Sequence, residues 1–168
     1  TINIVLHFFR SIELLDNLST ISSIDIDIDD QSHPGLLHVN TDKAIANLGT
    51  NDSKAKSNES PQMKVSFSYD FFLGKHEVTC REFIDLIDYK SIEESVKDDC
   101  TNDSLPIANI TYYDAVLFAN ARSKKENFDT VYTYQKASFD SKGHCSGLEG
   151  YSFHPDVNGY RLPPEAEW

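Results

Sequence analysis

The regular segments of this chain are short, and this feature constrains its fold most. Apolar residues recur at strand or helix spacing only over brief stretches, and polar stretches such as residues 50–60 and 90–104 separate them. Loops of this length are uncommon in compact domains unless the fold is built around them. We therefore expect an α+β fold of short strands, short helices and long loops, rather than a bundle or a regular barrel.

The strand predictions depend on alternation of apolar and polar residues. Lys64–Tyr69 alternates cleanly, which predicts a strand with one apolar face, and an extended segment continues over residues 71–75. Further short strands are expected at residues 36–39 and 131–134. A turn or hairpin is expected within the glycine-rich residues 140–150, with residues 151–153 as its return strand.

Two helix starts carry the spacing of a capping box, in which a threonine hydroxyl and an acidic side chain three residues later satisfy free backbone N–H groups. Thr79 with Glu82 predicts a helix over about residues 80–89. Thr111 with Asp114 predicts a second helix over about residues 112–124.

The remaining segments are weaker signals. Residues 90–104 are expected to form a loop or a weak helical turn, because they are charged and polar. A third helix is expected to begin within residues 159–168, where two prolines precede acidic residues that suit the positive end of a helix dipole. Because Pro164 has no capping oxygen, we expect this start to depend on Glu165, Glu167 or water.

Residues 1–35 are interpreted as an N-terminal extension or linker. Within them, residues 22–30 alternate apolar and acidic residues, which suits either a half-buried strand or an acidic linker. Residues 2–9 are apolar but too short to span a membrane, and a short strand or helix is favoured over the remnant of a signal segment.

Charge and composition exclude several function classes. The formal net charge is -12, from 27 acidic and 15 basic residues. A nucleic-acid partner requires a basic surface, and an anionic membrane repels an acidic chain, so neither is expected. The chain also has no apolar run of membrane-spanning length, so no membrane insertion is expected.

The three cysteines, Cys80, Cys100 and Cys145, form no Cys-x-x-Cys pair and lack zinc-site spacing. A disulfide in an extracytoplasmic compartment and buried free thiols are both open interpretations.

Several polar residues are candidates for a site. His144, Cys145 and His154 match no tight metal-ligand pattern, so turn and surface roles are favoured over a metal site. His76 and Glu77 are neighbours in an extended segment and would point to opposite faces, which argues against a joint acid–base pair. For Glu77 we predict a buried, hydrogen-bonded carboxylate.

Two further groups have structural interpretations. Arg161 and Glu165 are predicted to form an ion pair across the turn that leads into the third helix. Tyr132, Tyr134 and Tyr151 could line a ligand groove, although aromatic strand residues more often belong to a core.

Five segments, taken in order, carry a resemblance to a known family. They are Asn47–Thr50, Glu59–Val65, Phe72–Thr79, Leu105–Ala115 and Gly159–Trp168, the last reading Gly-Tyr-Arg-Leu-Pro-Pro-Glu-Ala-Glu-Trp. Together they resemble the formylglycine-generating-enzyme, or sulfatase-modifying-factor, family over residues 36–168. Pro164, Tyr112 and Cys80 depart from the residues usual in the family, which indicates a divergent member.

The resemblance implies a fold related to C-type lectins, here truncated to the N-terminal part of the domain. Family members oxidise a sulfatase cysteine to formylglycine with oxygen and a copper ion held by two cysteines. Those cysteines and the calcium ligands of the family lie after the last matching segment. No catalytic, cofactor-binding or metal residue is therefore assigned in this chain, and copper and calcium are expected only in a full-length parent.

Two functions stay open. We favour a non-catalytic binding or structural module in an extracytoplasmic or cell-envelope protein, because the signature is divergent. The alternative is a fragment of the copper-dependent oxidase, so whether the parent is an enzyme is undecided. The expected partners are the C-terminal half of the same domain and a protein or peptide substrate.

Overall fold

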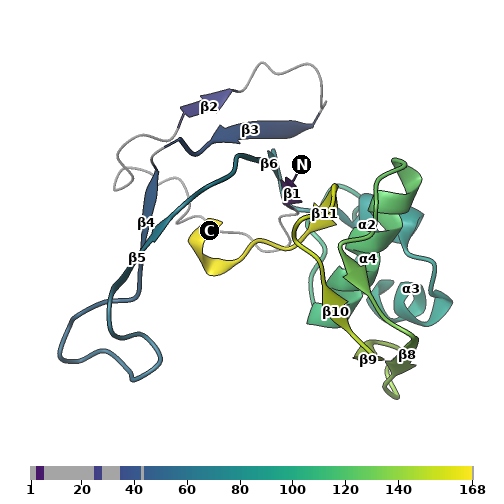
Figure 1. Cartoon of the computed structure of the whole chain (residues 1–168). Coiled ribbons are helices and arrows are strands. Elements are labelled where there is room, and N and C mark those ends of the chain that lie inside the picture. The colour runs from purple at the N-terminus through teal and green to yellow at the C-terminus, as the bar shows by residue number, and fades with distance from the viewer. Residues whose placement is uncertain (1–2, 6–24, 28–34, 43, 168) are drawn as a thin grey trace.

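The computed structural model describes residues 3–5, 25–27, 35–42 and 44–167. The helices gather on one side of the molecule, and a long β-hairpin projects on the other (Figure 1). The described elements form a small α+β fold of short strands and helices, as predicted from the sequence.

A mixed five-stranded sheet lies between these two parts. Its strand order is β11 (Gly159–Arg161), β1 (Asn3–Val5), β6 (Phe71–Gly74), β3 (Leu36–Asn40) and β2 (Asp25–Asp27). Strand β1 is parallel to both of its neighbours, whereas β3 is antiparallel to β6 and to β2. Strands β1 and β2 come from the first 35 residues, so the strand interpretations of both segments are confirmed. The division of the chain at residue 35 stays a prediction.

Three two-stranded antiparallel sheets complete the β structure. They pair β4 (Ile45–Leu48) with β5 (Met63–Ser66), β7 (Tyr132–Thr133) with β10 (Ser152–Phe153), and β8 (Lys136–Phe139) with β9 (Cys145–Glu149). A strand forms at residues 152–153 as expected, but it pairs with β7, and the strand that returns from the turn after β8 is β9.

One strand prediction needs correction. The strand expected over residues 64–69 ends at Ser66, because Ser66 pairs with Ile45, the first residue of β4, and no further β4 residue remains to pair. The turn or hairpin expected within residues 140–150 is confirmed, since a turn over residues 140–144 joins β8 to β9. There the Asp140 side chain accepts hydrogen bonds from the backbone N–H groups of Lys142 and His144.

Both capping boxes are present. Thr79 and Glu82 cap α2 (Cys80–Leu86), and Thr111 and Asp114 cap α4 (Tyr112–Lys125). Helix α2 ends three residues earlier than predicted, because Ile87 adopts an extended backbone.

The segment expected to form a loop or a weak helical turn after α2 contains a further helix, α3 (Lys90–Val96). Its two apolar residues, Ile92 and Val96, are four apart and fully buried, so tertiary packing stabilises a helix that is otherwise polar. At the other end of the chain, the third expected helix is a single 3₁₀ turn, η2 (Glu165–Glu167).

The main core lies beneath α4. Residues 115–119 are all buried, and Phe118 stacks on Phe83 of α2 with 5.2 Å between ring centroids. A disulfide joins Cys80 to Cys100, while Cys145 is a buried free thiol, so each of the two cysteine interpretations applies to part of the set. A second, smaller cluster joins Val39 to Phe71.

Among the described residues, no helix is both long and apolar enough to cross a bilayer.

Candidate functional site

An open groove of about 880 Å³ runs along the edge of the β7–β10 sheet and the end of β11. Aromatic side chains form much of its wall: Tyr69, Tyr112, Tyr132, Tyr151 and Phe153. The other lining residues are Ser68, Pro155, Asp156, Arg161, Leu162, Pro163 and Pro164. The groove therefore combines an aromatic surface with one acidic and one basic side chain.

Tyr132 forms the buried base of the aromatic surface. Its ring is stacked on those of Phe153 and Tyr151, at centroid distances of 5.4 and 6.0 Å. Its hydroxyl oxygen accepts a hydrogen bond from the backbone N–H of Leu162. Burial raises the pKa of Tyr132 to about 12, so this ring is neutral over the physiological range.

The outer rings of the groove remain accessible. Tyr112 is 54% exposed and Phe153 is 47% exposed, and the hydroxyl groups of Tyr112 and Tyr151 are hydrogen-bonded at 2.9 Å. Because an exposed aromatic ring offers apolar area at a low entropy cost, this surface suits stacking against a ligand.

Arg161 enters the groove from β11 and is almost fully buried. Its guanidinium group forms a bidentate pair with Glu167, with N–O distances of 2.7 and 2.6 Å. The predicted pair with Glu165 is wrong, because the 3₁₀ turn buries Glu167 and leaves Glu165 exposed. Burial alone would lower the pKa of Arg161, but the hydrogen bonds and charge of Glu167 outweigh burial and raise it.

Tyr69 completes this charged group. Its hydroxyl donates to Glu167 at 2.7 Å, and the Arg161 guanidinium carbon lies 6.0 Å from the centre of its ring. Burial, followed by the hydrogen bond to Glu167, raises the pKa of Tyr69 to about 12. Tyr69 therefore stays neutral and keeps donating to the carboxylate.

One donor in this group is left over. The Arg161 Nε atom is buried and has no hydrogen-bond partner among the residues that the structure describes. Buried polar groups in native proteins nearly always have a partner in the protein, in ordered water or in a ligand. Because this atom is also shielded from solvent, a ligand in the groove does not reach it in this conformation.

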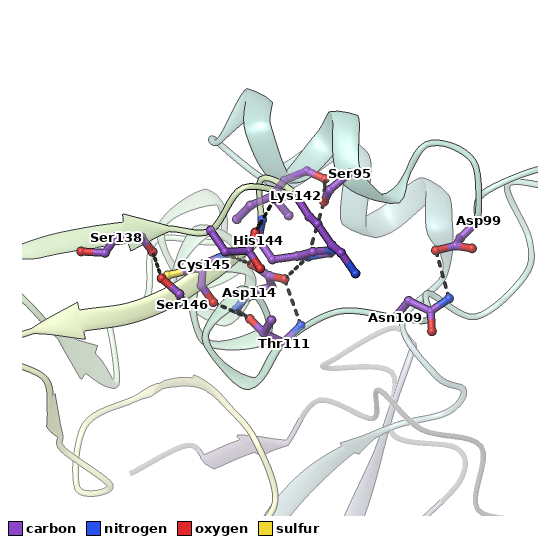
Figure 2. Close-up of polar contacts among 12 residues, drawn as sticks. Ser95, Asp99, Asn109, Thr111, Asp114, Ser138, Lys142, His144, Cys145 and Ser146 are labelled. Carbon is purple, nitrogen blue, oxygen red and sulfur yellow. Dashed lines mark hydrogen bonds and ion pairs between the residues drawn. The ribbon is translucent and has the colours of Figure 1, made fainter.

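A second polar network surrounds Asp114 and is shown in Figure 2. The buried carboxylate accepts hydrogen bonds from the backbone N–H groups of Thr111 and Cys145, at 2.9 and 2.7 Å, and lies 2.7 Å from Nδ1 of His144. The Thr111 hydroxyl in turn donates to the Cys145 carbonyl oxygen. This network fastens the start of α4 to β9, and we assign it a structural role.

His144, His154 and Cys145, the residues considered above as metal ligands, each have a hydrogen-bond partner in the protein. His144 contacts Asp114, whereas His154 contacts the Thr133 hydroxyl through Nε2. The thiol of Cys145 is directed to the Gly147 carbonyl oxygen, and burial raises its pKa. In the described part of the chain, no three His, Cys, Asp or Glu side chains form a group that could hold a metal ion.

His76 and Glu77 lie in a bend after β6 rather than in a strand. His76 is exposed, and its Nδ1 lies 2.9 Å from the Glu77 carbonyl oxygen. Glu77 is only half-buried, so the prediction of a buried carboxylate is wrong. The bend at residues 75–76 follows the end of β6 at Gly74, and Val78 after it is buried again.

The three tyrosines that the sequence offered as groove candidates separate into two groups. Tyr132 and Tyr151 line the groove, whereas the Tyr134 hydroxyl pairs with that of Tyr89 at 3.0 Å, away from the groove lining. Sequence reasoning missed the contributions of Tyr69, Tyr112 and Phe153. Each lies in a segment whose local pattern indicated only a strand or a helix start, and nothing in that pattern indicates that the three segments meet.

The described residues form a small α+β domain with an aromatic groove, beside which Arg161 and Glu167 form a buried ion pair. The family model of the Sulfatase-modifying factor enzyme 1-like domain matches residues 35–168, and the chain therefore belongs to this family. The resemblance inferred from the five segments is thus confirmed.

A curated relative is similar to part of this chain. It is the "Chaperone protein LppX" of Paenibacillus barcinonensis, which is 34% identical over 107 residues. The match covers 59% of this chain and 34% of the relative, so the chain spans about a third of the relative's length. No solved structure matches the chain.

Proposed function

We propose that this chain belongs to a non-catalytic binding module of the sulfatase-modifying-factor family, and that its aromatic groove holds an extended segment of another protein. The observation that carries the proposal is the wall of aromatic rings along the groove, in which Tyr112 and Phe153 are accessible. The side chains of an extended peptide can pack on such rings.

The chemistry of the groove supports binding more than catalysis. Arg161 is held as a cation by Glu167, and Tyr69 and Tyr132 have raised pKa values that keep them protonated. A general acid or base functions best with a pKa near the working pH, which these groups do not have.

A location outside the cytoplasm or in the cell envelope is part of this proposal. The Cys80–Cys100 disulfide supports it, because structural disulfides persist mainly in oxidising compartments. The printed name of the relative, a chaperone protein, is in line with a module that binds polypeptides. We also propose a relation of the fold to C-type lectins and packing of this chain against a C-terminal part of the same domain.

The second candidate function is part of an oxygen- and copper-dependent oxidase that forms formylglycine from a sulfatase cysteine. Family membership favours it. The described residues do not fit a copper ion held by two cysteines, because Cys80 and Cys100 are bonded to each other and Cys145 is the only free thiol among them. Such a copper site, and any calcium site, would be supplied by other residues of the parent protein.

Binding to an unfolded chain tests the first proposal. Fluorescently labelled, reduced and carboxymethylated lactalbumin should bind the full 168-residue chain, detected by fluorescence anisotropy. Phe153→Ala should weaken the affinity by about tenfold, because one exposed ring of a binding surface is lost. The matched control is Phe139→Ala, an exposed ring outside the groove lining, which should leave binding unchanged.

Absence of binding, or equal loss in both variants, would argue against the groove. The oxidase is tested separately by incubating the full-length parent with copper, oxygen and a sulfatase-motif peptide and measuring the peptide mass. Conversion of the cysteine would replace the non-catalytic proposal with the oxidase.

A further inference from the structure

The five-stranded sheet contains a strand drawn from outside the family domain. The family model begins at residue 35, whereas β1 is formed by Asn3–Val5 and lies between β6 and β11, which both belong to the matched region (Figure 1). The family domain thus presents two facing edges. Because paired strands lie about 4.8 Å apart, these edges border a slot roughly 9–10 Å wide, the width of one strand.

The two strands that border this slot, β6 and β11, also have contacts that do not involve β1. Strand β6 pairs with β3 over four residues, from Leu36 with Gly74 to Val39 with Phe71. On the other side of the slot, side-chain hydroxyl groups accept hydrogen bonds from the backbone at the outer edge of β11. The backbone N–H of Tyr160 donates to the Ser123 hydroxyl at 2.8 Å, and that of Leu162 donates to the Tyr132 hydroxyl.

Strand geometry determines which peptide groups of β11 face the slot. Successive residues of a strand direct their N–H and C=O groups to opposite edges. Since Tyr160 faces Ser123, the peptide groups of Gly159 and Arg161 face the slot, and both residues are buried. In the folded chain β1 pairs along this edge. The slot therefore recognises a strand mainly through its backbone.

Strand β1, which occupies the slot, pairs with its neighbours over only a few residues. Asn3, Ile4 and Val5 pair with β11, and only Ile4 and Val5 pair with β6. Each backbone hydrogen bond contributes about 1 kcal/mol net, so three residues provide a small total. Closing the slot also brings Val5 against Leu73 of β6, with β2 to β5 between them in the sequence, and pairing over such a separation has an entropy cost.

We propose that the slot between β6 and β11 is a strand-accepting site, which binds an extended polypeptide segment parallel to both edges, and that Asn3–Val5 is its occupant within the chain. Backbone pairing provides the affinity, and β-branched residues such as Ile4 and Val5 suit an extended segment. This site is separate from the aromatic groove and does not rest on the function proposed for that groove.

A peptide with the sequence of residues 1–10 tests the site in the full-length chain. Ile4→Pro removes a backbone donor from β1 and should release the internal strand. The labelled peptide should then bind this variant at least about tenfold more tightly than it binds the wild type, measured by fluorescence anisotropy. On binding, the amides of Gly159 and Arg161 should gain protection from hydrogen exchange.

The controls distinguish binding in the slot from binding elsewhere on the chain. Ser57→Pro, in an exposed loop, should behave as the wild type, and a peptide carrying Ile4→Pro itself should not bind. Phe153→Ala should leave peptide binding unchanged, because the groove is not involved. If Ile4→Pro fails to fold, Ile4→Gly weakens β1 without removing the donor. The proposal is overturned if the folded variant binds no peptide, binds it no better than the wild type, or loses binding with Phe153→Ala.

Discussion

Arg161 lies where the ion pair, the aromatic groove and the sheet meet. Its side chain is paired with Glu167 inside the groove, and its backbone belongs to β11. A buried charge is tolerated only when it is paired and hydrogen-bonded, so the local structure depends on Glu167 more than on any exposed acid nearby.

Substitution of Glu167 should therefore be costly. Glu167→Ala leaves the Arg161 cation buried without its partner, and we expect a loss of about 3–5 kcal/mol in the free energy of unfolding. Urea denaturation measures this loss. The control, Glu165→Ala, removes an exposed carboxylate two residues away and should change stability by less than about 0.5 kcal/mol. Equal effects would contradict the pairing described here.

The tyrosines of the groove predict a loss of stability at alkaline pH. The pKa of Tyr69 is raised from 10.0 to about 12 in the folded chain, so the folded state holds this proton more tightly than the unfolded state does. The resulting stabilisation is complete below pH 10 and is lost as the pH rises towards 12. Ultraviolet titration of tyrosinate, compared between the wild type and Tyr69→Phe, should show one group fewer near pH 12. A group missing near pH 10 instead would contradict the assignment.

At the scale of single residues, the sequence predicted what depends on neighbours along the chain. Both capping boxes could be predicted because their partners are three residues apart. The ion-pair partner of Arg161 could not be predicted in this way, because Glu165 and Glu167 differ only in which side of a short 3₁₀ turn they occupy. The same limit applies to Tyr69, whose partner Glu167 is 98 residues away.

At the scale of elements, long-range contacts decided the cases that local patterns left open. Helix α3 is polar except for Ile92 and Val96, and it lies in a segment that the disulfide closes at Cys100. The turn between β8 and β9 packs against it, because a Cβ atom at Gly143 would lie 2.4 Å from the Ser91 carbonyl oxygen. The local pattern predicted a loop or a weak helical turn here, and these contacts explain why the segment forms a helix.

The disulfide should contribute strongly to the stability of this region. Cys80 and Cys100 are 20 residues apart, and a crosslink closing a loop of this size contributes about 3 kcal/mol. The double substitution Cys80→Ala and Cys100→Ala should lower the free energy of unfolding by this amount in urea denaturation, and a reducing agent should do the same to the wild type. No change on reduction would contradict the pairing.

Thiol titration provides an independent check on the third cysteine. Cys145 is buried and its pKa is raised by burial, so it should not react with a thiol reagent in the folded chain. One thiol per chain should become reactive when the protein is unfolded without reduction. Three reactive thiols would show that the disulfide is absent.

At the scale of the whole molecule, the described chain has two apolar clusters of unequal size. The large one surrounds α4, and the small one joins β3 to β6 around Val39 and Phe71. The β4–β5 hairpin lies away from α2, α3 and α4 (Figure 1), pairs only with itself in the described structure, and has β4 in contact with the 3₁₀ turn η2. Two-stranded hairpins are marginally stable without extensive further packing, and one 3₁₀ turn provides little of it, so this part should open most readily.

Native-state hydrogen exchange should show this order. Amides in β4 and β5 should exchange well before those of α4, because local opening of the hairpin exposes little apolar area. Mass spectrometry of peptides from residues 45–66 and 112–125 would compare the two segments. Equal protection in both would mean that the hairpin and the helical core unfold as one unit.

The general class of the fold could be predicted from the sequence, whereas its assembly could not. Segment lengths and turn residues indicated an α+β domain with long loops. The insertion of β1 between β6 and β11 joins residues more than 60 positions apart, and three residues carry too little pattern to indicate a partner at that distance.

The position of Arg161 has one further consequence. Its backbone borders the strand slot and its side chain forms part of the groove, so an occupant of either site acts on the same residue. If a ligand in the groove changes the affinity of the slot for its strand by some factor, a strand in the slot must change the affinity of the groove for its ligand by the same factor. A polypeptide that displaces Asn3–Val5 would then change the affinity of the groove for its ligand, and Arg161 would couple the two sites.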